Sequence, residues 1–126
     1  MNIVMIASEC VPFIKAGRLA DVARTLPKYL KKLGYDVRII LPKYADLDGK
    51  QYNIKTLPYR LLVKVVQDTE SFRIKYCLTE DNIYVYFIEN MCFFSRPGIY
   101  GNNGQDYSDN GEHYISALES VKTLIF

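Results

Sequence analysis

An α/β fold is the class that this sequence predicts: a Rossmann-like parallel or mixed sheet with flanking helices and a short antiparallel insertion. Residues 3–42 have the pattern of an apolar strand, an amphipathic helix and a second apolar strand, which is the order of a βαβ unit. Further strand-like segments follow closely between residues 59 and 89 and indicate antiparallel pairing through short turns. With 126 residues and 49% hydrophobic content, the chain can form one domain with a real core.

The first strand is predicted at residues 3–7, a continuous apolar run rich in β-branched residues. Strands of this type are buried on both faces, so we expect it at the centre of the sheet. A helix follows, because apolar residues then recur at intervals of three and four until Gly34 stops the pattern. Pro27 inside this helix predicts a bend or a break. The recurring apolar positions are Leu19, Val22, Ala23, Leu26, Leu30 and Leu33.

Three later segments complete the predicted sheet. The second strand, "DVRIILP" at residues 36–42, ends at a proline. At residues 70–79 apolar and polar side chains alternate, which is typical of a strand with one face in the core. The sequence "TEDN" at residues 79–82 then predicts a tight turn. Residues 82–89 are apolar on both faces, so we expect this strand to re-enter the main sheet.

A long loop is predicted at residues 93–111, which contain four glycines, one proline and three asparagines. Asp109 and Glu112 have the spacing of a capping box, and an apolar stripe at helical intervals follows them. The chain therefore predicts a last helix. Its final residues, "VKTLIF", form an apolar surface whose exposure predicts self-association.

Composition excludes several classes of partner. Sixteen basic and fourteen acidic side chains give a net charge of +2 without a block of like charges, which argues against nucleic-acid and membrane-surface binding. No apolar run reaches the roughly 18 residues of a membrane span, and no secretion signal is recognisable. Cys10, Cys77 and Cys92 are far apart, which favours buried thiols in a cytoplasmic protein. We expect no metal and no cofactor.

Residues 8–18 join the first strand to the helix, at the position where parallel α/β proteins bind ligands. Backbone N–H groups and the helix dipole favour an anion there, and Lys15 adds a positive charge. The loop matches neither the GxGxxG fingerprint nor the GxxxxGK[ST] P-loop. From spacing alone, Lys15 is more often a plain surface lysine, and Asp21 in the first helical turn is more often only a favourable dipole partner.

Two separated motifs favour a ligand-binding role for this loop over a plain surface lysine. The segment "SECVPFIKAGRLADVARTLPKYLKKLGYDVRIILPKY" resembles the opening of bacterial glycogen synthases and plant starch synthases, in which Lys-x-Gly-Gly-Leu-(Gly/Ala)-Asp-Val precedes a helix containing Leu-Pro. The segments "FFSRPGIYG" and "DYSDNGEHY" resemble a second loop of the same family. Both motifs occur in the family's order, so the resemblance covers the whole chain.

The resemblance implies a retaining glucosyltransferase with two Rossmann-like domains, of the GT-B type. Such an enzyme transfers glucose from ADP-glucose, or UDP-glucose in some relatives, to the end of an α-1,4-glucan acceptor. Lys15 and Gly17 match the family's positions for contacting the sugar nucleotide, and Asp21 matches a position that contacts the donor or orders the loop. Tyr100 and Gly101 match a loop that borders the cleft, where Tyr100 could stack on a sugar.

Arg18 departs from the family pattern, which has a second glycine at this position. If the backbone there requires positive φ or close contact with phosphate, an arginine strains the loop or fills the site, and we expect this outcome. Alternatively, the guanidinium group itself reaches a phosphate.

The resemblance also implies that residues 1–126 form an incomplete amino-terminal catalytic domain. The family's histidine-bearing loop and second domain have no counterpart in this sequence, so no catalytic residue is assigned here. We expect the isolated chain to be inactive, because catalysis in a cleft needs both walls. The alternative function is a non-catalytic module of the same fold that binds a sugar nucleotide or another protein.

Overall fold

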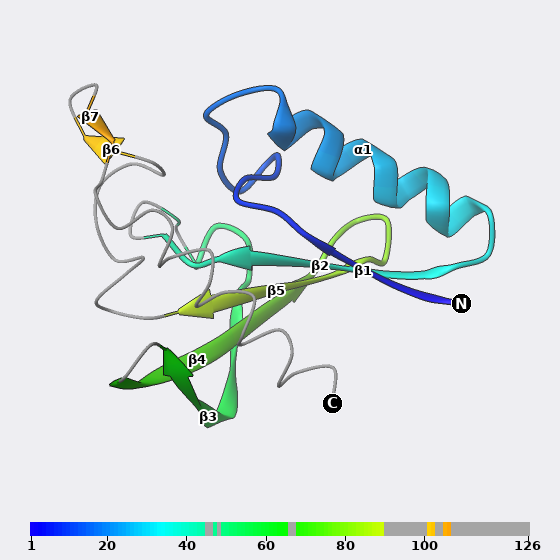
Figure 1. The fold of residues 1–126 in the computed structure, drawn as a ribbon. Coiled ribbons are helices and arrows are strands. Elements are labelled where there is room, and N and C mark those ends of the chain that lie inside the picture. The colour runs from blue at the N-terminus through cyan, green and yellow to red at the C-terminus, as the bar shows by residue number, and fades with distance from the viewer. Residues whose placement is uncertain (45–46, 48, 66–67, 90–100, 103–104, 107–126) are drawn as a thin grey trace.

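The computed structural model describes residues 1–44, 47, 49–65, 68–89, 101–102 and 105–106. Its elements are β1 (Asn2–Ile6), α1 (Leu19–Lys32), β2 (Asp36–Pro42), β3 (Lys55–Val65), β4 (Asp68–Leu78), β5 (Tyr84–Glu89), β6 (Gly101–Asn102) and β7 (Gln105–Asp106). Five strands form one sheet in the order β1-β2-β5-β4-β3, while β6 and β7 form a separate ribbon (Figure 1). The strands β1, β2 and β5 are parallel, and β4 pairs antiparallel with both β5 and β3. The predicted mixed α/β sheet with an antiparallel insertion is confirmed.

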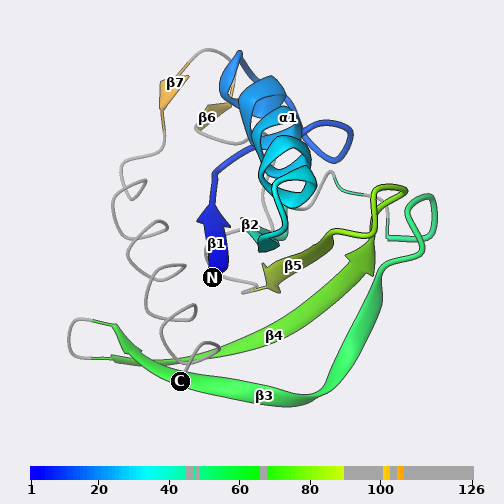
Figure 2. The same ribbon diagram turned by 90° about the vertical axis from the view of Figure 1, so that its right-hand side faces the viewer.

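The predicted βαβ unit is present as β1, α1 and β2, with α1 lying across one face of the sheet (Figure 2). Ala20, Ala23 and Pro27 are the buried residues of α1. Their small side chains allow the helix to approach the strands closely. The helix continues through Pro27 as one element. The strand β1, which was expected at the centre of the sheet, lies at the edge of the sheet that the described residues form.

Four of the six apolar positions predicted in α1 are exposed, whereas Ala23 is buried and Leu30 is half-buried. Leu19, Val22, Leu26, Tyr29 and Leu33 are 43% to 73% exposed. The three- and four-residue spacing therefore predicted the helix correctly without identifying the face that packs, because small residues also pack against the sheet.

The self-association predicted for the last residues concerns a segment outside the described residues.

The end of α1 is a glycine-terminated Schellman motif. Gly34 has φ of +96°, its N–H donates to Lys31 O at 2.9 Å, and the N–H of Tyr35 donates to Leu30 O at 3.3 Å. The predicted stop at Gly34 is confirmed, because the left-handed backbone at this position suits glycine.

We expect Gly34→Ala to lower the free energy of unfolding by about 1 kcal/mol. The cost comes from the backbone alone, because a Cβ at Gly34 would have no atom within 4 Å. Gly49→Ala is the matched control: φ at Gly49 is not positive and a Cβ there would lie 3.8 Å from Ile54 Cβ. Urea denaturation measures both variants, and equal losses of stability would contradict the prediction.

The predicted turn at residues 79–82 joins β4 to β5 and holds the end of the sheet against α1. Within the turn, the N–H of Asn82 donates to Thr79 O at 2.9 Å. Lys31 Nζ donates to the carbonyl oxygens of Asp81 and Asn82, and Arg24 pairs with the Asp81 carboxylate at 3.2 Å. Basic side chains of α1 thus fix this corner of the fold.

The core fills the space between α1 and the sheet. Its buried members on that side include Ile39 and Leu41 from β2, and Val85 and Phe87 from β5. Phe72 and Ile74 of β4 are fully buried as well.

No helix among the described residues is long and apolar enough to cross a membrane.

Candidate functional site

The loop between β1 and α1, residues 7–18, begins at the carboxyl end of the parallel strands, as predicted. Cys10 and Ile14 close its first part by exchanging two backbone hydrogen bonds of 3.0 Å. The N–H of Val11 donates to Ala20 O at 3.1 Å and ties this part to α1. The first part of the loop is therefore closed on itself and attached to α1.

Aromatic side chains secure the base of the same loop. The Phe13 ring meets the rings of Tyr52 and Phe87 edge-on, at 5.1 Å between centroids in each case. Tyr52 also donates its hydroxyl to Pro12 O at 3.0 Å. Because Phe87 belongs to the core, these contacts connect the loop to the centre of the domain.

Lys15 and Asp21, both predicted site residues, form an ion pair. Their Nζ and Oδ2 atoms are 2.8 Å apart, and each side chain is 53% exposed. Asp21 lies in the first turn of α1, where a carboxylate also interacts favourably with the helix dipole. The structure thus brings two predicted site residues into contact, while the Lys15 side chain stays half exposed and both roles expected for Asp21 stay predictions.

Gly17 adjoins this pair, and its environment does not demand glycine. Its φ is not positive, and an added Cβ would lie 3.6 Å from Glu9 Oε1, an ordinary contact distance. The fold itself therefore does not require glycine at position 17. The predicted reason for a glycine there, a ligand that approaches the backbone, stays a prediction.

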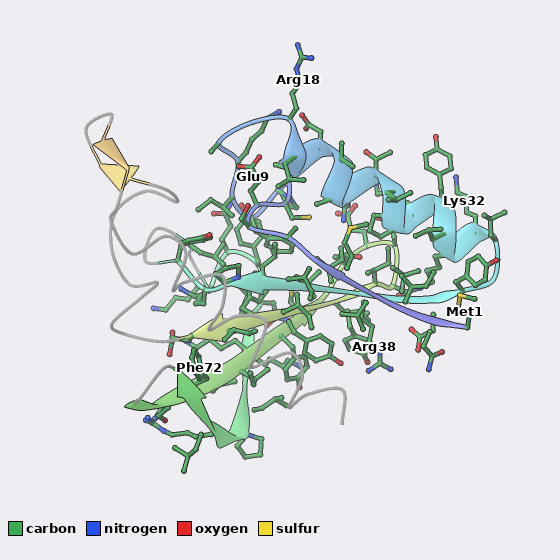
Figure 3. All side chains as sticks on the ribbon, in the orientation of Figure 1. Met1, Glu9, Arg18, Lys32, Arg38 and Phe72 are labelled. Carbon is green, nitrogen blue, oxygen red and sulfur yellow. The ribbon has the colours of Figure 1, made fainter. Side chains whose placement is uncertain are left out.

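Arg18 corrects the expectation of a strained loop. It caps α1 with φ of −72° and ψ of −21°, a right-handed conformation that every L-residue adopts without strain. Its side chain is exposed and extends away from the ribbon (Figure 3). The interpretation that a Cβ at position 18 strains the loop is therefore wrong.

The second predicted loop is described only in part. Gly101 belongs to β6 and pairs with Asp106 of β7, so a short antiparallel ribbon lies inside the predicted loop. Tyr100 lies outside the described residues. The structure therefore brings together Lys15, Gly17 and Asp21, whereas the roles predicted for Tyr100 and Gly101 stay predictions.

Glu9 is the residue that motif reasoning missed. Its carboxylate is buried beneath the loop and accepts hydrogen bonds from the N–H groups of Ala16, Gly17 and Ala20 at 3.0 to 3.1 Å (Figure 3). The signal available in the sequence was a glutamate placed directly after an apolar strand and ahead of the Lys15 motif.

Two neighbouring cysteines provide no nucleophile. Burial raises the pKa of the Cys10 thiol and of the Cys77 thiol to about 11, so both remain protonated at neutral pH. Both are free of disulfides. Among the described residues, no group of three acidic, histidine or cysteine side chains has the arrangement of a metal site.

Parallel strands followed by a first loop that presents a lysine beside a helix N-terminus resemble the arrangement of phosphate-binding α/β proteins. A family model described as the starch synthase catalytic domain matches residues 2–124. The glycogen synthase of Bacillus cereus (strain B4264) is 44% identical over 134 residues, which cover all of this chain. Glycogen synthase 1 of Geobacter metallireducens is 36% identical over 136 residues, again across the whole chain.

A solved structure agrees with these relatives. The catalytic domain of starch synthase IV from Arabidopsis thaliana, bound to ADP and acarbose, superposes with a TM-score of 0.85 at 27% identity over 98% of this chain. The chain belongs to the starch and glycogen synthase family. It spans 26% of the length of the two glycogen synthases and 25% of the starch synthase chain.

Proposed function

We propose that this segment is one wall of the donor site in a retaining glucosyltransferase that moves glucose from ADP-glucose to an α-1,4-glucan. The observation that carries the proposal is the exposed Lys15 ammonium group, held by Asp21 beside the N-terminus of α1. The diphosphate of a sugar nucleotide is the anion that this position suits. The starch synthase IV structure is bound to ADP and acarbose, which supports the same classes of donor and acceptor.

In this proposal, two backbone N–H groups at the helix N-terminus receive a phosphate. Glu9 already accepts from Ala16, Gly17 and Ala20. The N–H groups of Arg18 and Leu19 have no acceptor among the described residues. A phosphate that receives these two N–H groups would lie at the helix N-terminus, where the helix dipole also favours an anion. The Arg18 side chain is dispensable in this arrangement, because its backbone N–H makes the contact.

Glucose transfer tests the proposed function. We expect a full-length synthase that contains this segment to incorporate labelled glucose from ADP-glucose into glycogen, with release of ADP. UDP-glucose in a parallel reaction measures donor preference. Failure of both donors, with a folded protein and glycogen present, would overturn the proposal and favour the non-catalytic module.

We further propose that the protein acts in the cytoplasm, since the buried thiols of Cys10 and Cys77 suit a reducing compartment. In this proposal no metal takes part in donor binding; Lys15 supplies the positive charge, and the two backbone N–H groups supply hydrogen bonds.

A further inference from the structure

Glu9 is the only buried charged side chain among the residues that the structure describes, with 2% of its surface exposed. None of the ion pairs found in the described part of the chain includes Glu9. A buried carboxylate is costly unless hydrogen bonds replace its hydration. Three backbone N–H groups and the positive end of the α1 dipole perform that task here.

These three hydrogen bonds span the whole candidate site. One oxygen, Oε2, accepts from Ala16, the residue next to Lys15. The other, Oε1, accepts from Gly17 and from Ala20 in the first turn of α1. This side chain therefore helps to set the spacing between the lysine and the helix N-terminus, together with the Lys15–Asp21 ion pair and the hydrogen bond from Val11 to Ala20. Apolar packing adds little there, because residues 15–19 are all exposed.

We propose that Glu9 is the positioning residue of the donor site: it holds the loop in its binding conformation before the donor arrives and determines which backbone N–H groups the phosphate can reach. The inference rests on the function proposed above. By occupying the N–H groups of Ala16, Gly17 and Ala20, the carboxylate leaves those of Arg18 and Leu19 for the ligand.

The charge of Glu9 contributes in a second way. A carboxylate behind the loop repels a phosphate that moves toward the interior, and Lys15 attracts it from the solvent side. The two charges together confine the anion to the outer surface of the loop. Donor affinity then depends on Glu9 without any contact between Glu9 and the donor.

Hydrogen exchange at residue resolution on the unmodified full-length synthase tests the proposal first. Without ligand, we expect the amides of Ala16, Gly17 and Ala20 to exchange slowly and those of Arg18 and Leu19 to exchange rapidly. Addition of ADP slows Arg18 and Leu19 and leaves the other three unchanged. Rapid exchange at Ala16 and Gly17 before ADP is added would overturn the positioning role, even if ADP protects Arg18 and glucose transfer is normal. If ADP protects neither Arg18 nor Leu19 and no transfer occurs, the proposed function itself fails.

The second test is Glu9→Gln, which keeps the size of the side chain but replaces one acceptor with a donor. We expect KM for ADP-glucose and the inhibition constant of ADP to rise at least about tenfold, with kcat within about threefold and KM for glycogen unchanged. Glu9→Asp keeps both acceptors on a shorter side chain and should show an intermediate rise.

Glu80→Gln is the matched control, since Glu80 is exposed in the turn between β4 and β5. Glu80→Gln should leave KM for ADP-glucose, the inhibition constant of ADP, kcat and KM for glycogen unchanged. An unchanged donor KM in Glu9→Gln, or a loss of kcat alone, would contradict the positioning role. If Glu9→Gln does not fold, the same criteria apply to Glu9→Asp, and the hydrogen-exchange result decides independently of any substitution.

Discussion

Replacement of Lys15 by alanine is expected to raise KM for ADP-glucose by about 10- to 100-fold in a full-length synthase that contains this segment. Hydrogen bonds between charged groups contribute about 1.5 to 3 kcal/mol, and each 1.4 kcal/mol corresponds to a factor of about ten in affinity. The Lys15 side chain is 53% exposed, so its ammonium group can exchange Asp21 for a diphosphate without a change in the backbone. Initial rates over a range of donor concentrations measure the effect.

Lys32→Ala provides the control for this experiment. Lys32 is an exposed lysine in the last turn of the same helix, far from the loop, where it lies 5.3 Å from the centre of the Tyr29 ring (Figure 3). Its removal should change KM less than twofold. A donor KM that is equal in both variants would show that Lys15 is an ordinary surface lysine, the commoner outcome for its spacing.

The second large effect concerns the 126-residue chain by itself. Calorimetric titration with ADP-glucose should give no measurable binding, or a Kd weaker than about 1 mM. The proposed donor site in this chain consists of one ammonium group and two backbone N–H groups, and a cleft ligand needs contacts from both walls to be held in place. The relatives extend over about four times this length.

A micromolar Kd for the isolated chain, lost in Lys15→Ala, would contradict that expectation. Such a result would mean that the loop by itself is a complete donor site. It would also favour a stand-alone sugar-nucleotide-binding module over a portion of a two-walled enzyme.

Much of the fold could be predicted from local patterns. The apolar runs, the helical spacing ending at Gly34 and the turn at residues 79–82 all correspond to observed elements. These features depend on interactions between residues close in the chain, which is why periodicity and turn chemistry report them. The loop carrying Lys15 was placed correctly for the same reason, since it follows an apolar strand and precedes an amphipathic helix.

Other features depend on packing and could not be read from the pattern. The spacing of Leu19, Val22 and Leu26 does not show that this stripe faces solvent, because Ala20 and Ala23 serve equally well as a packing face. The position of β1 beside β2, at the edge of the sheet that the described residues form, depends on which strands pair with it. The consequence of Arg18 depends on a backbone angle, and the observed φ of −72° removes the expected strain.

The sequence by itself determined the α/β class, the family resemblance and the candidate residues Lys15, Gly17 and Asp21, because motifs and periodicities are properties of neighbouring residues. Only the tertiary structure decided how these residues work together. It pairs Lys15 with Asp21 and places Glu9 beneath the loop, with hydrogen bonds to residues seven to eleven positions further along the chain. Such contacts are decided by the path of the folded backbone, and that path brings three backbone N–H groups of the loop and helix to the Glu9 carboxylate.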